Sequence, residues 1–365
     1  MTLTDQIHVD IAEHDYAIYF GSGLLEGFQA YLPEKLKMAP HFFICDEHTQ
    51  EYAKPVAGGR PLYTVKSGEE SKSFAELQQL IAWALEHKID RHSVVIAIGG
   101  GVVGDLSGFA ASIILRGVPI VQVPTTLLSM VDSSVGGKTG INMPHGKNLV
   151  GTFYQPSAVI CDFDVLKTLP DRELKAGYAE ILKYALLGNA GFFDWLKENG
   201  KKVLALEPEA LSYAVKVSCE MKAQIVKEDE RETSGRRALL NLGHTFAHVF
   251  EAEMGYDGRL LHGEAVAVGM ICAMELSVRK GWLDEPDVRA VRAHMKDVGL
   301  KTTIAEAGLP QDVDVEKLYA RMFSDKKVKA GAINFVVMKA IGQAFLDNSI
   351  EKEDVMAVLT SCYEA

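Results

Sequence analysis

The sequence predicts two domains, an α/β domain with a mostly parallel sheet over residues 1–170 and a largely α-helical domain over residues 171–365. A chain of 365 residues exceeds the size of a comfortable single core. Before Pro170, short apolar runs alternate with helical stretches, which is the pattern of a helix-covered parallel sheet. After Pro170 the apolar periodicity is helical almost throughout.

The expected strands are short runs rich in β-branched and aromatic residues. They lie at 41–45, 61–65, 94–98, 120–123 and 158–161, and runs near 6–11 and 16–20 predict an antiparallel hairpin at one edge. Between them, residues 73–87 have the Phe-x-x-Leu-x-x-Leu-Ile spacing of an amphipathic helix. In the second domain only residues 332–338 have strand character. Ligands are expected in the cleft between the two domains.

The composition is typical of an ordinary soluble globular protein, with 48% hydrophobic and 24% charged residues. A net charge of −11 argues against nucleic acid or an anionic membrane surface as the main partner. The five cysteines are scattered, without Cys-x-x-Cys spacing, which favours reduced thiols over a disulfide framework or a thiolate metal site. The sequence begins without a signal-peptide pattern, and its apolar runs are too short to span a bilayer.

A glycine-rich segment, Ile96–Asp105, runs from an expected strand into an expected helix. Gly99, Gly101 and Gly104 match the dinucleotide spacing G-x-G-x-x-G, in which glycine lets backbone N–H groups approach a pyrophosphate. The segment departs from that pattern because it follows a middle strand and has no acid about 20 residues later. Asp46 is an alternative partner for the ribose hydroxyls. A purely structural role, in which the glycines let a helix pack closely on the sheet, would explain the same pattern.

Two further loops follow expected strands and are rich in polar groups. Residues 67–72 offer both acids and a lysine, and residues 124–138 place two threonines, after Pro124, straight after a strand. Loops at the carboxyl edge of a parallel sheet are where ligands bind, although an isolated lysine is more often solvated surface. The polar residues that these loops and the next turn supply include Thr125, Thr126, Asp132, Lys138, Lys147 and Asn148.

Residues 241–269 contain three of the 11 histidines. His244 and His248 lie on one face of an expected helix, Glu251 continues that face, and His262 opens the next helical run. Two imidazoles at i, i+4 with a third from a nearby helix are a way to build a zinc site with an open position. A single histidine is more often a satisfied core or surface residue, but the cluster favours a metal site in which all three are ligands.

A carboxylate lies on an earlier expected helix, where Glu180 and Lys183 are i, i+3 neighbours among apolar and aromatic residues. A surface ion pair has the same spacing, but a buried charge needs a metal or a partner charge, so Glu180 is a candidate zinc carboxylate. Downstream cations that could hold an anionic substrate are Lys222, Arg236, Arg237 and the run 325–327.

Nearly the whole chain resembles the 3-dehydroquinate synthase family of the bacterial type. The motifs that carry the resemblance occur in order and are Gly99–Asp105 with the following Leu-x-Gly-Phe, Val123–Ser129, Val131–Lys138, Gly146–Asn148, Phe153–Pro156, Tyr178–Lys183, Asn241–Phe246 and Leu261–Val266. The resemblance implies a Rossmann-like NAD-binding domain at 1–170 and a helical metal- and substrate-binding domain at 171–365. It also implies NAD and Zn²⁺ (or Co²⁺) as cofactors, a cytoplasmic homodimer, and no nucleic-acid or membrane partner.

The activity that the resemblance implies is that of a phosphate-eliminating carbon–oxygen lyase of the shikimate pathway. Such an enzyme converts the anionic sugar-acid phosphate 3-deoxy-D-arabino-heptulosonate 7-phosphate (DAHP) to 3-dehydroquinate, toward chorismate and the aromatic amino acids. The steps are transient oxidation by NAD, phosphate elimination, reduction, ring opening and intramolecular aldol closure. The alternatives are a related sugar phosphate cyclase with a neutral substrate, a metal-dependent polyol dehydrogenase, and a non-catalytic binding protein.

The resemblance also assigns residues. The metal ligands would be Glu180, His244 and His262, with His248 in the substrate pocket instead. The NAD contacts would be Asp46, Ser67, Gly68, Glu69, Glu70, Ser71, Lys72, Gly101, Val102, Val103, Gly104, Asp105, Thr125, Thr126, Lys138, Lys147, Val165, Leu166, Lys167 and Thr168.

The substrate would be held from both domains, and a residue of one subunit, Arg116, would reach into the site of its partner. The residues implied to be catalytic are Asp132, Lys138, Lys183, Arg237, Asn241 and His248, and the further substrate contacts are Asn148, Lys222 and Lys326. The loop Thr233–Arg237 is one residue longer than is usual in the family, so either Arg236 or Arg237 takes the arginine's role. The distance from Asn241 along the chain favours Arg237.

Overall fold

The computed structural model describes residues 2–11, 14–323, 328–329 and 332–363. They form two compact units, Met1–Pro170 with Leu206–Arg231, and Asp171–Ala205 with Glu232–Ala365. The expected boundary after Pro170 therefore coincides with a boundary between units. Residues 206–231, expected in the helical domain, group instead with the first unit.

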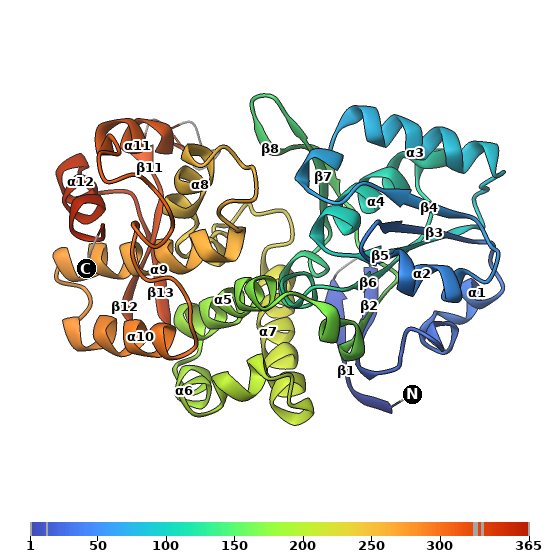
Figure 1. The fold of residues 1–365 in the computed structure, drawn as a ribbon, viewed down its shortest axis with the longest axis horizontal. Coiled ribbons are helices and arrows are strands. Elements are labelled where there is room, and N and C mark those ends of the chain that lie inside the picture. Colours follow the sequence, from blue (N-terminus) through green and yellow to red (C-terminus); the bar gives the residue numbers. More distant parts are fainter. Residues whose placement is uncertain (1, 12–13, 324–327, 330–331, 364–365) are drawn as a thin grey trace. The chain divides into compact units, whose positions relative to one another are not determined.

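The first unit is built on a seven-stranded sheet in the order β1-β2-β9-β6-β5-β3-β4 (Figure 1). Every residue of β5, β6 and β9 is buried, as expected for parallel strands with helices on both faces. The hairpin β1–β2 is antiparallel at one edge, and the other neighbours pair in parallel. The strands are β1 (Thr2–Ile11), β2 (His14–Ser22), β3 (His41–Asp46), β4 (Leu62–Val65), β5 (Val94–Gly99), β6 (Ile120–Pro124) and β9 (Ala158–Asp162).

Helices cover both faces of this sheet, with α3 and α4 on one side and α2 on the other (Figure 1). The helices are α1 (Glu34–Lys37), α2 (Gln50–Ala57), α3 (Phe74–Glu86) and α4 (Gly101–Ile113). The predicted α/β class, edge hairpin and helix at 73–87 are thereby confirmed.

A second hairpin, β7 (Lys138–Met143) and β8 (Gly146–Phe153), was not predicted. It packs on α4 so closely that a Cβ on Gly108 would lie 2.4 Å from Thr139 Cγ2. Its importance is positional, because it carries Lys138, Lys147 and Asn148.

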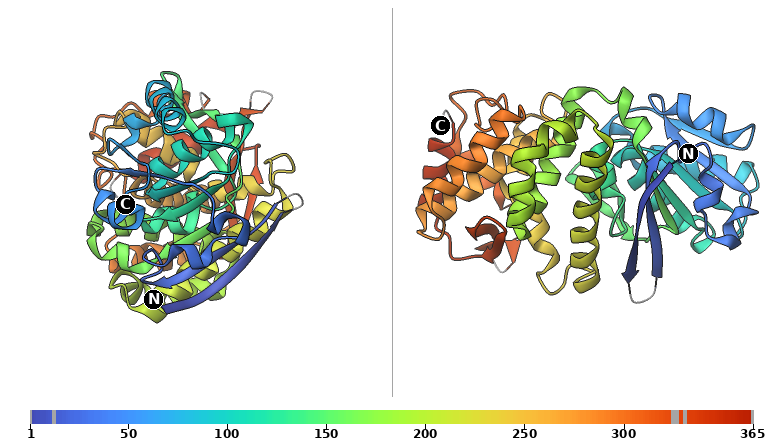
Figure 2. Two further views of the ribbon diagram at one scale, coloured as in Figure 1. Left: turned by 90° about the vertical axis from the view of Figure 1, so that its right-hand side faces the viewer. Right: turned by 90° about the horizontal axis from the view of Figure 1, so that it is seen from below.

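The helix α7 (Pro208–Glu228) belongs to the first unit and lies beside β1 (Figure 2). Lys216 and Lys227 reach from it to β1, with Nζ 2.5 Å from Asp5 Oδ2 and 2.6 Å from Asp10 Oδ2. Apolar residues on its other positions, including Leu211 and Val215, are buried.

The second unit is mostly helical, as predicted. Its helices are α5 (Asp171–Gly188), α6 (Ala190–Leu204), α8 (His244–Glu253), α9 (His262–Arg279), α10 (Glu285–Asp297), α11 (Val315–Met322) and α12 (Lys352–Ser361). The strand character at 332–338 is confirmed by β11 (Ala332–Ile333) and β12 (Phe335–Ala340), whose partners are β10 (Val328–Lys329) and β13 (Gln343–Asp347). Among the described residues, no helix combines the length and the apolar character needed to cross a membrane.

A buried histidine in this unit makes its stability depend on pH. Burial lowers the pKa of His294 from 6.5 to about 4, with Lys197 adding to the shift and Asp297 opposing it. The imidazole Nε2 lies 2.9 Å from the hydroxyl of Tyr178 on α5. The unfolded chain takes up this proton near pH 6.5, so the contribution of His294 to stability is complete above that pH and is lost as the pH falls toward 4.

We therefore expect the wild-type protein to lose about 2 kcal/mol more unfolding free energy than the variant His294→Gln between roughly pH 7.5 and pH 5. Glutamine does not titrate but can still accept the tyrosine hydrogen bond. Urea unfolding of both proteins at several pH values measures the difference. Parallel pH profiles would show that His294 titrates normally in the folded protein.

Candidate functional site

Three ligand-type side chains converge in the second unit: Glu180 from α5, His244 at the start of α8, and His262 at the start of α9. One ligand atom from each lies within 4.8 Å of the others. Glu180 Oε1 is 3.7 Å from Nε2 of His244 and 3.5 Å from Nε2 of His262. A tetrahedral zinc site with bonds of about 2.0–2.1 Å has ligand atoms about 3.3 Å apart, so these atoms lie near metal-ligand spacing.

Glycines beside the two histidines bring the three helices together. A Cβ on Gly263 would lie 2.0 Å from the carbonyl oxygen of Ala176 on α5, so no larger residue fits next to His262. A Cβ on Gly269 would lie 2.2 Å from the carbonyl oxygen of Gly243. Gly243 itself has φ 79°, a left-handed conformation in which glycine is unstrained. The close approach of α9 to both other helices therefore depends on these glycines.

The donor set fits a divalent metal ion. Glu180 is fully buried, so its charge needs a cation close by. Its charge contacts the ammonium of Lys183, which is also buried. One carboxylate and two imidazoles leave a fourth position for water or substrate, which is the ligand arrangement of catalytic zinc.

The outer nitrogens of both imidazoles have acceptors. Nδ1 of His244 is 3.2 Å from the carbonyl oxygen of Leu242, and Nδ1 of His262 is 3.3 Å from Glu251 Oε2. Burial opposes the charge on His262, but Glu251 and Glu180 outweigh it and raise its pKa to about 10. In the absence of metal His262 is therefore protonated at neutral pH, and metal binding must displace that proton.

His248 lies next to this group but is not part of it. Its ring centroid is 5.7 Å from that of His244 and 6.4 Å from that of His262. Among the described residues, the group with metal-ligand spacing consists of Glu180, His244 and His262, without His248. The interpretation from spacing alone, with three histidine ligands, does not match this geometry, whereas the set implied by the family resemblance does.

The segment η6 (Arg237–Asn241) carries two further predicted residues. Arg237 is only 2% exposed whereas Arg236 is exposed, so burial favours Arg237 as the site arginine. Asn241 Nδ2 lies 3.4 Å from Glu232 Oε1, a contact that brings in an acid the sequence did not indicate. Lys326, predicted to bind substrate, lies outside the described residues.

In the first unit, the predicted nucleotide-binding residues meet at the carboxyl edge of the sheet. The Thr125 N–H donates to the Gly99 carbonyl oxygen at 3.0 Å, and Thr49 Oγ1 donates to the Ile98 carbonyl oxygen at 2.9 Å. Asp46 Oδ1 in turn accepts the N–H of Thr49 at 2.8 Å. The ends of β3, β5 and β6 are thus joined around the glycine turn.

The helix α4 begins at Gly101, immediately after that turn. A Cβ on Gly99 would lie 2.5 Å from Val103 Cβ, and one on Gly104 would lie 2.9 Å from Gln122 Oε1. The glycines are therefore needed for packing, and the same packing places the N–H groups of the first helical turn at the sheet edge, where they suit a pyrophosphate. Nearby, Ser67 Oγ is buried without a hydrogen-bond partner among the described residues, so it can bind a ligand.

A buried lysine links three predicted segments at this edge. Lys72 is 4% exposed, and its Nζ lies 2.7 Å from Asp105 Oδ2 and 3.4 Å from Glu69 Oε1 and also contacts Asn148 Oδ1. Burial works against its charge, but Asp105 and Glu69 outweigh burial and raise the pKa of Lys72. The ammonium therefore joins the 67–72 loop, α4 and the β7–β8 hairpin.

A second buried lysine, Lys222 of α7, contacts Asp132 in the short π-helix η4 (Ser129–Ser133). Its Nζ is 2.5 Å from the Asp132 carbonyl oxygen and also contacts Oδ1. This pair explains why α7 belongs with the first unit and brings two predicted substrate residues together.

The remaining predicted residues, in η5 (Phe163–Thr168) and at Arg116, make few contacts that indicate a ligand site. In η5, Val165 and Leu166 have buried side chains, so only their backbone is suited to a cofactor contact. Lys167 pairs with Asp164 at 2.7 Å on the surface. Arg116 ends η3 (Ile114–Arg116) with φ 70° and forms no ion pair within the described part of the chain.

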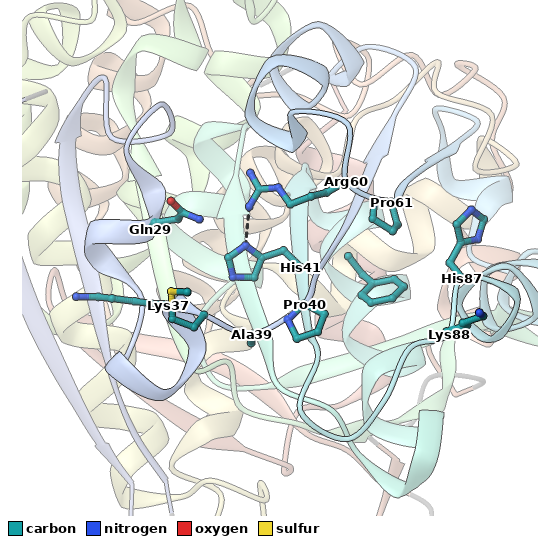
Figure 3. Close-up of a pocket in the computed structure, with 11 residues that line it drawn as sticks. Gln29, Lys37, Ala39, Pro40, His41, Arg60, Pro61, His87 and Lys88 are labelled. Carbon is teal, nitrogen blue, oxygen red and sulfur yellow. Dashed lines mark hydrogen bonds between the residues drawn. The ribbon is translucent and has the colours of Figure 1, made fainter.

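A separate cavity of about 370 Å³ lies at the opposite, amino-terminal end of β3 and β4 (Figure 3). Its arginine, Arg60, donates to His41 Nδ1 at 2.8 Å and to the carbonyl oxygens of Ala57 and Val56 at 2.7 and 2.5 Å. The same guanidinium stacks on the Phe43 ring, 4.9 Å from its centroid. Arg60 thus serves packing, and none of the predicted site residues lines this cavity.

Comparisons with known proteins agree with these features. Residues 62–176 match the 3-dehydroquinate synthase N-terminal family, and residues 177–328 match the 3-dehydroquinate synthase C-terminal family. A 3-dehydroquinate synthase of Cereibacter sphaeroides is 44% identical over 364 residues, covering 97% of this chain and 97% of that protein.

Two solved structures have the same fold. One is 2-deoxy-scyllo-inosose synthase complexed with carbaglucose-6-phosphate, NAD⁺ and Co²⁺ (TM-score 0.87, 25% identity, 98% of this chain and 100% of that chain). The other is ValA, the 2-epi-5-epi-valiolone synthase of Streptomyces hygroscopicus, with NAD⁺ and Zn²⁺ bound (TM-score 0.83, 26% identity, 97% and 98%). With both family matches and a relative of 44% identity over 97% of its length, the chain belongs to the 3-dehydroquinate synthase family.

Proposed function

We propose that the protein is a 3-dehydroquinate synthase that converts DAHP to 3-dehydroquinate and phosphate in the shikimate pathway. The observation that carries the proposal is the convergence of Glu180, His244 and His262 in a chain of this family. The cyclases of known structure are only 25% and 26% identical, against 44% for the synthase of Cereibacter sphaeroides. This difference favours DAHP over the substrates of the related cyclases.

The proposal assigns NAD to the carboxyl edge of the sheet and a divalent metal, Zn²⁺ or Co²⁺, to the three-residue set. When bound, NAD supplies a reversible hydride acceptor, and the metal supplies a Lewis acid for substrate oxygens. The first turn of α4 would hold the pyrophosphate, and Asp46 would accept hydrogen bonds from ribose hydroxyls. The buried carboxylate of Glu180 and Nε2 of each histidine would hold the metal.

The substrate is an anion, and the cationic residues fit it in an otherwise acidic protein. Lys138, Arg237 and Asn241 would hold the carboxylate, since charge-assisted hydrogen bonds to carboxylates are strong and directional. Lys183, Lys222, Lys326 and Asn148 would bind further oxygens, and His248 and Asp132 would orient hydroxyl groups. The last carbon–carbon bond formation is intramolecular and would need mainly a held conformation.

We also propose a cytoplasmic homodimer in which Arg116 reaches the substrate of the partner subunit. The exposure and lack of an ion pair at Arg116 within the described part of the chain support this role. Mixing an Arg116→Ala protein with a Lys183→Ala protein tests it, because mixed dimers would regain one intact site.

Phosphate release by the purified protein with NAD and zinc tests the main proposal. We expect release from DAHP, with no steady accumulation of NADH because the hydride is returned to the substrate. Release from glucose 6-phosphate or sedoheptulose 7-phosphate but not from DAHP would identify a related cyclase. Steady NADH formation from a simple polyol would identify a dehydrogenase.

A further inference from the structure

We propose that Glu251 is a positioning residue that sets the tautomer and orientation of His262 for metal binding. The inference rests on the proposed metal site and adds a residue that does not itself touch the metal. It concerns the strength of metal binding rather than the identity of the substrate.

The His262 ring lies between two carboxylates. Nδ1 is 3.3 Å from Glu251 Oε2, and Nε2 is 3.5 Å from Glu180 Oε1. A proton on Nδ1 can be donated to Glu251, which leaves the lone pair of Nε2 for a metal ion. Glu251 is only 3% exposed, so its interaction with the imidazole is poorly screened by water.

The two proposed histidine ligands differ in how strongly packing restrains their imidazole rings. The side chain of His244 is 9% exposed, and its Nδ1 faces the backbone carbonyl of Leu242 at 3.2 Å. The side chain of His262 is 33% exposed, so packing restrains its ring less. A carboxylate on Nδ1 compensates for this freedom and also makes Nε2 a more basic ligand than a backbone carbonyl would.

The backbone at His262 is fixed by a different acid. Glu264 accepts the N–H of Leu261 at 2.9 Å and receives Arg172 Nε at 2.8 Å, which caps the start of α9. Loss of the Glu251 carboxylate should therefore release the imidazole without displacing the helix that carries it.

Zinc affinity of Glu251 variants tests the proposal, measured by competition with a chromophoric chelator. We expect about a tenfold loss for Glu251→Gln, which keeps an acceptor but loses the charge, and about a hundredfold loss for Glu251→Ala. The visible absorption spectrum of the Co²⁺-loaded protein should change in the same order. The matched control is Glu253→Gln on the same helix, whose carboxylate pairs with Lys317 and Arg321 at 2.9 and 3.2 Å.

A merely structural role gives a different result. Glu251→Ala would then lower the melting temperature of the metal-free protein yet bind zinc within twofold of the wild-type affinity, which would overturn the proposal. Zinc binding by the wild type that is unaffected by Glu180→Gln would instead refute the proposed metal site. A wild-type site with normal zinc binding but no activity on DAHP would leave the role of Glu251 intact and contradict only the proposed function.

Discussion

Replacing Glu180 with glutamine is expected to remove bound zinc from the protein and, with it, the phosphate release from DAHP. A protein zinc site with four ligands is worth about 10–16 kcal/mol, so each ligand contributes about 3 kcal/mol, or more than a hundredfold in affinity. Glutamine has nearly the same shape as glutamate, so the change removes the charge and leaves the packing. Metal content after dialysis and chelator competition measure the loss.

Histidine variants make this test more specific, because His248 lies one turn after the proposed ligand His244 on α8 but is not in the proposed ligand set. His262→Ala should lose zinc as Glu180→Gln does, whereas His248→Ala should retain it and lose activity through the substrate. Zinc loss in His248→Ala as large as in the other two variants would contradict the assignment of His248 to the substrate rather than to the metal. Thermal unfolding of each protein without metal is the control, because Glu180→Gln also removes the carboxylate that contacts Lys183.

Replacing Lys72 with methionine is expected to destabilise the protein by about 3 kcal/mol and to weaken NAD binding. Removing one member of a buried ion pair leaves the other charge uncompensated, which costs about 3–5 kcal/mol. The lower value applies here because the side chains of Asp105 and Glu69 are 18% and 30% exposed. Urea unfolding and fluorescence titration with NAD measure the two effects.

A surface ion pair in the same unit is the control for this variant. Lys227 pairs with Asp10, and their side chains are 51% and 71% exposed, so Lys227→Met should leave the unfolding free energy almost unchanged. Adding Asp105→Asn to Lys72→Met should recover part of the lost stability, since the two residues are in contact. A Lys72→Met protein as stable as the control would mean that the ammonium is solvated.

Local patterns in the sequence were enough for the main architecture. The strands β5 and β6 are continuous buried runs such as Val94–Gly99, and α3 has a clear apolar face, so each element is recognisable from its own residues. The family resemblance then assigned the metal set that the structure brings together. The recognised strands and helices share one property: the information that predicts them lies within a few adjacent residues, whereas the proposed metal set joins three segments that are far apart in the sequence.

The features that the sequence did not predict depend on contacts that no local pattern shows. The β7–β8 hairpin is rich in glycine, which is depleted in strands, and the reason for Gly151 lies across the hairpin: a Cβ there would meet the Thr139 carbonyl oxygen at 1.9 Å. Similarly, the spacing of His244 and His248 cannot reveal that a carboxylate from α5 approaches the first of them. Glu232 gave no signal, because a single acid in a charged loop resembles any solvated residue.

The placement of α7 has a consequence for how the chain can be made and recombined. The first unit is completed only by Leu206–Arg231, so during synthesis it cannot finish packing until residue 231 has left the ribosome. By then Glu180 has also left the ribosome, but His244 and His262 have not. A fragment ending at Pro170 would lack Lys222 and leave Asp132 and β1 without the helix that packs on them. Exchange of segments between relatives by a single crossover at Pro170 would therefore split a folding unit, whereas exchange of 206–231 together with 1–170 would preserve it.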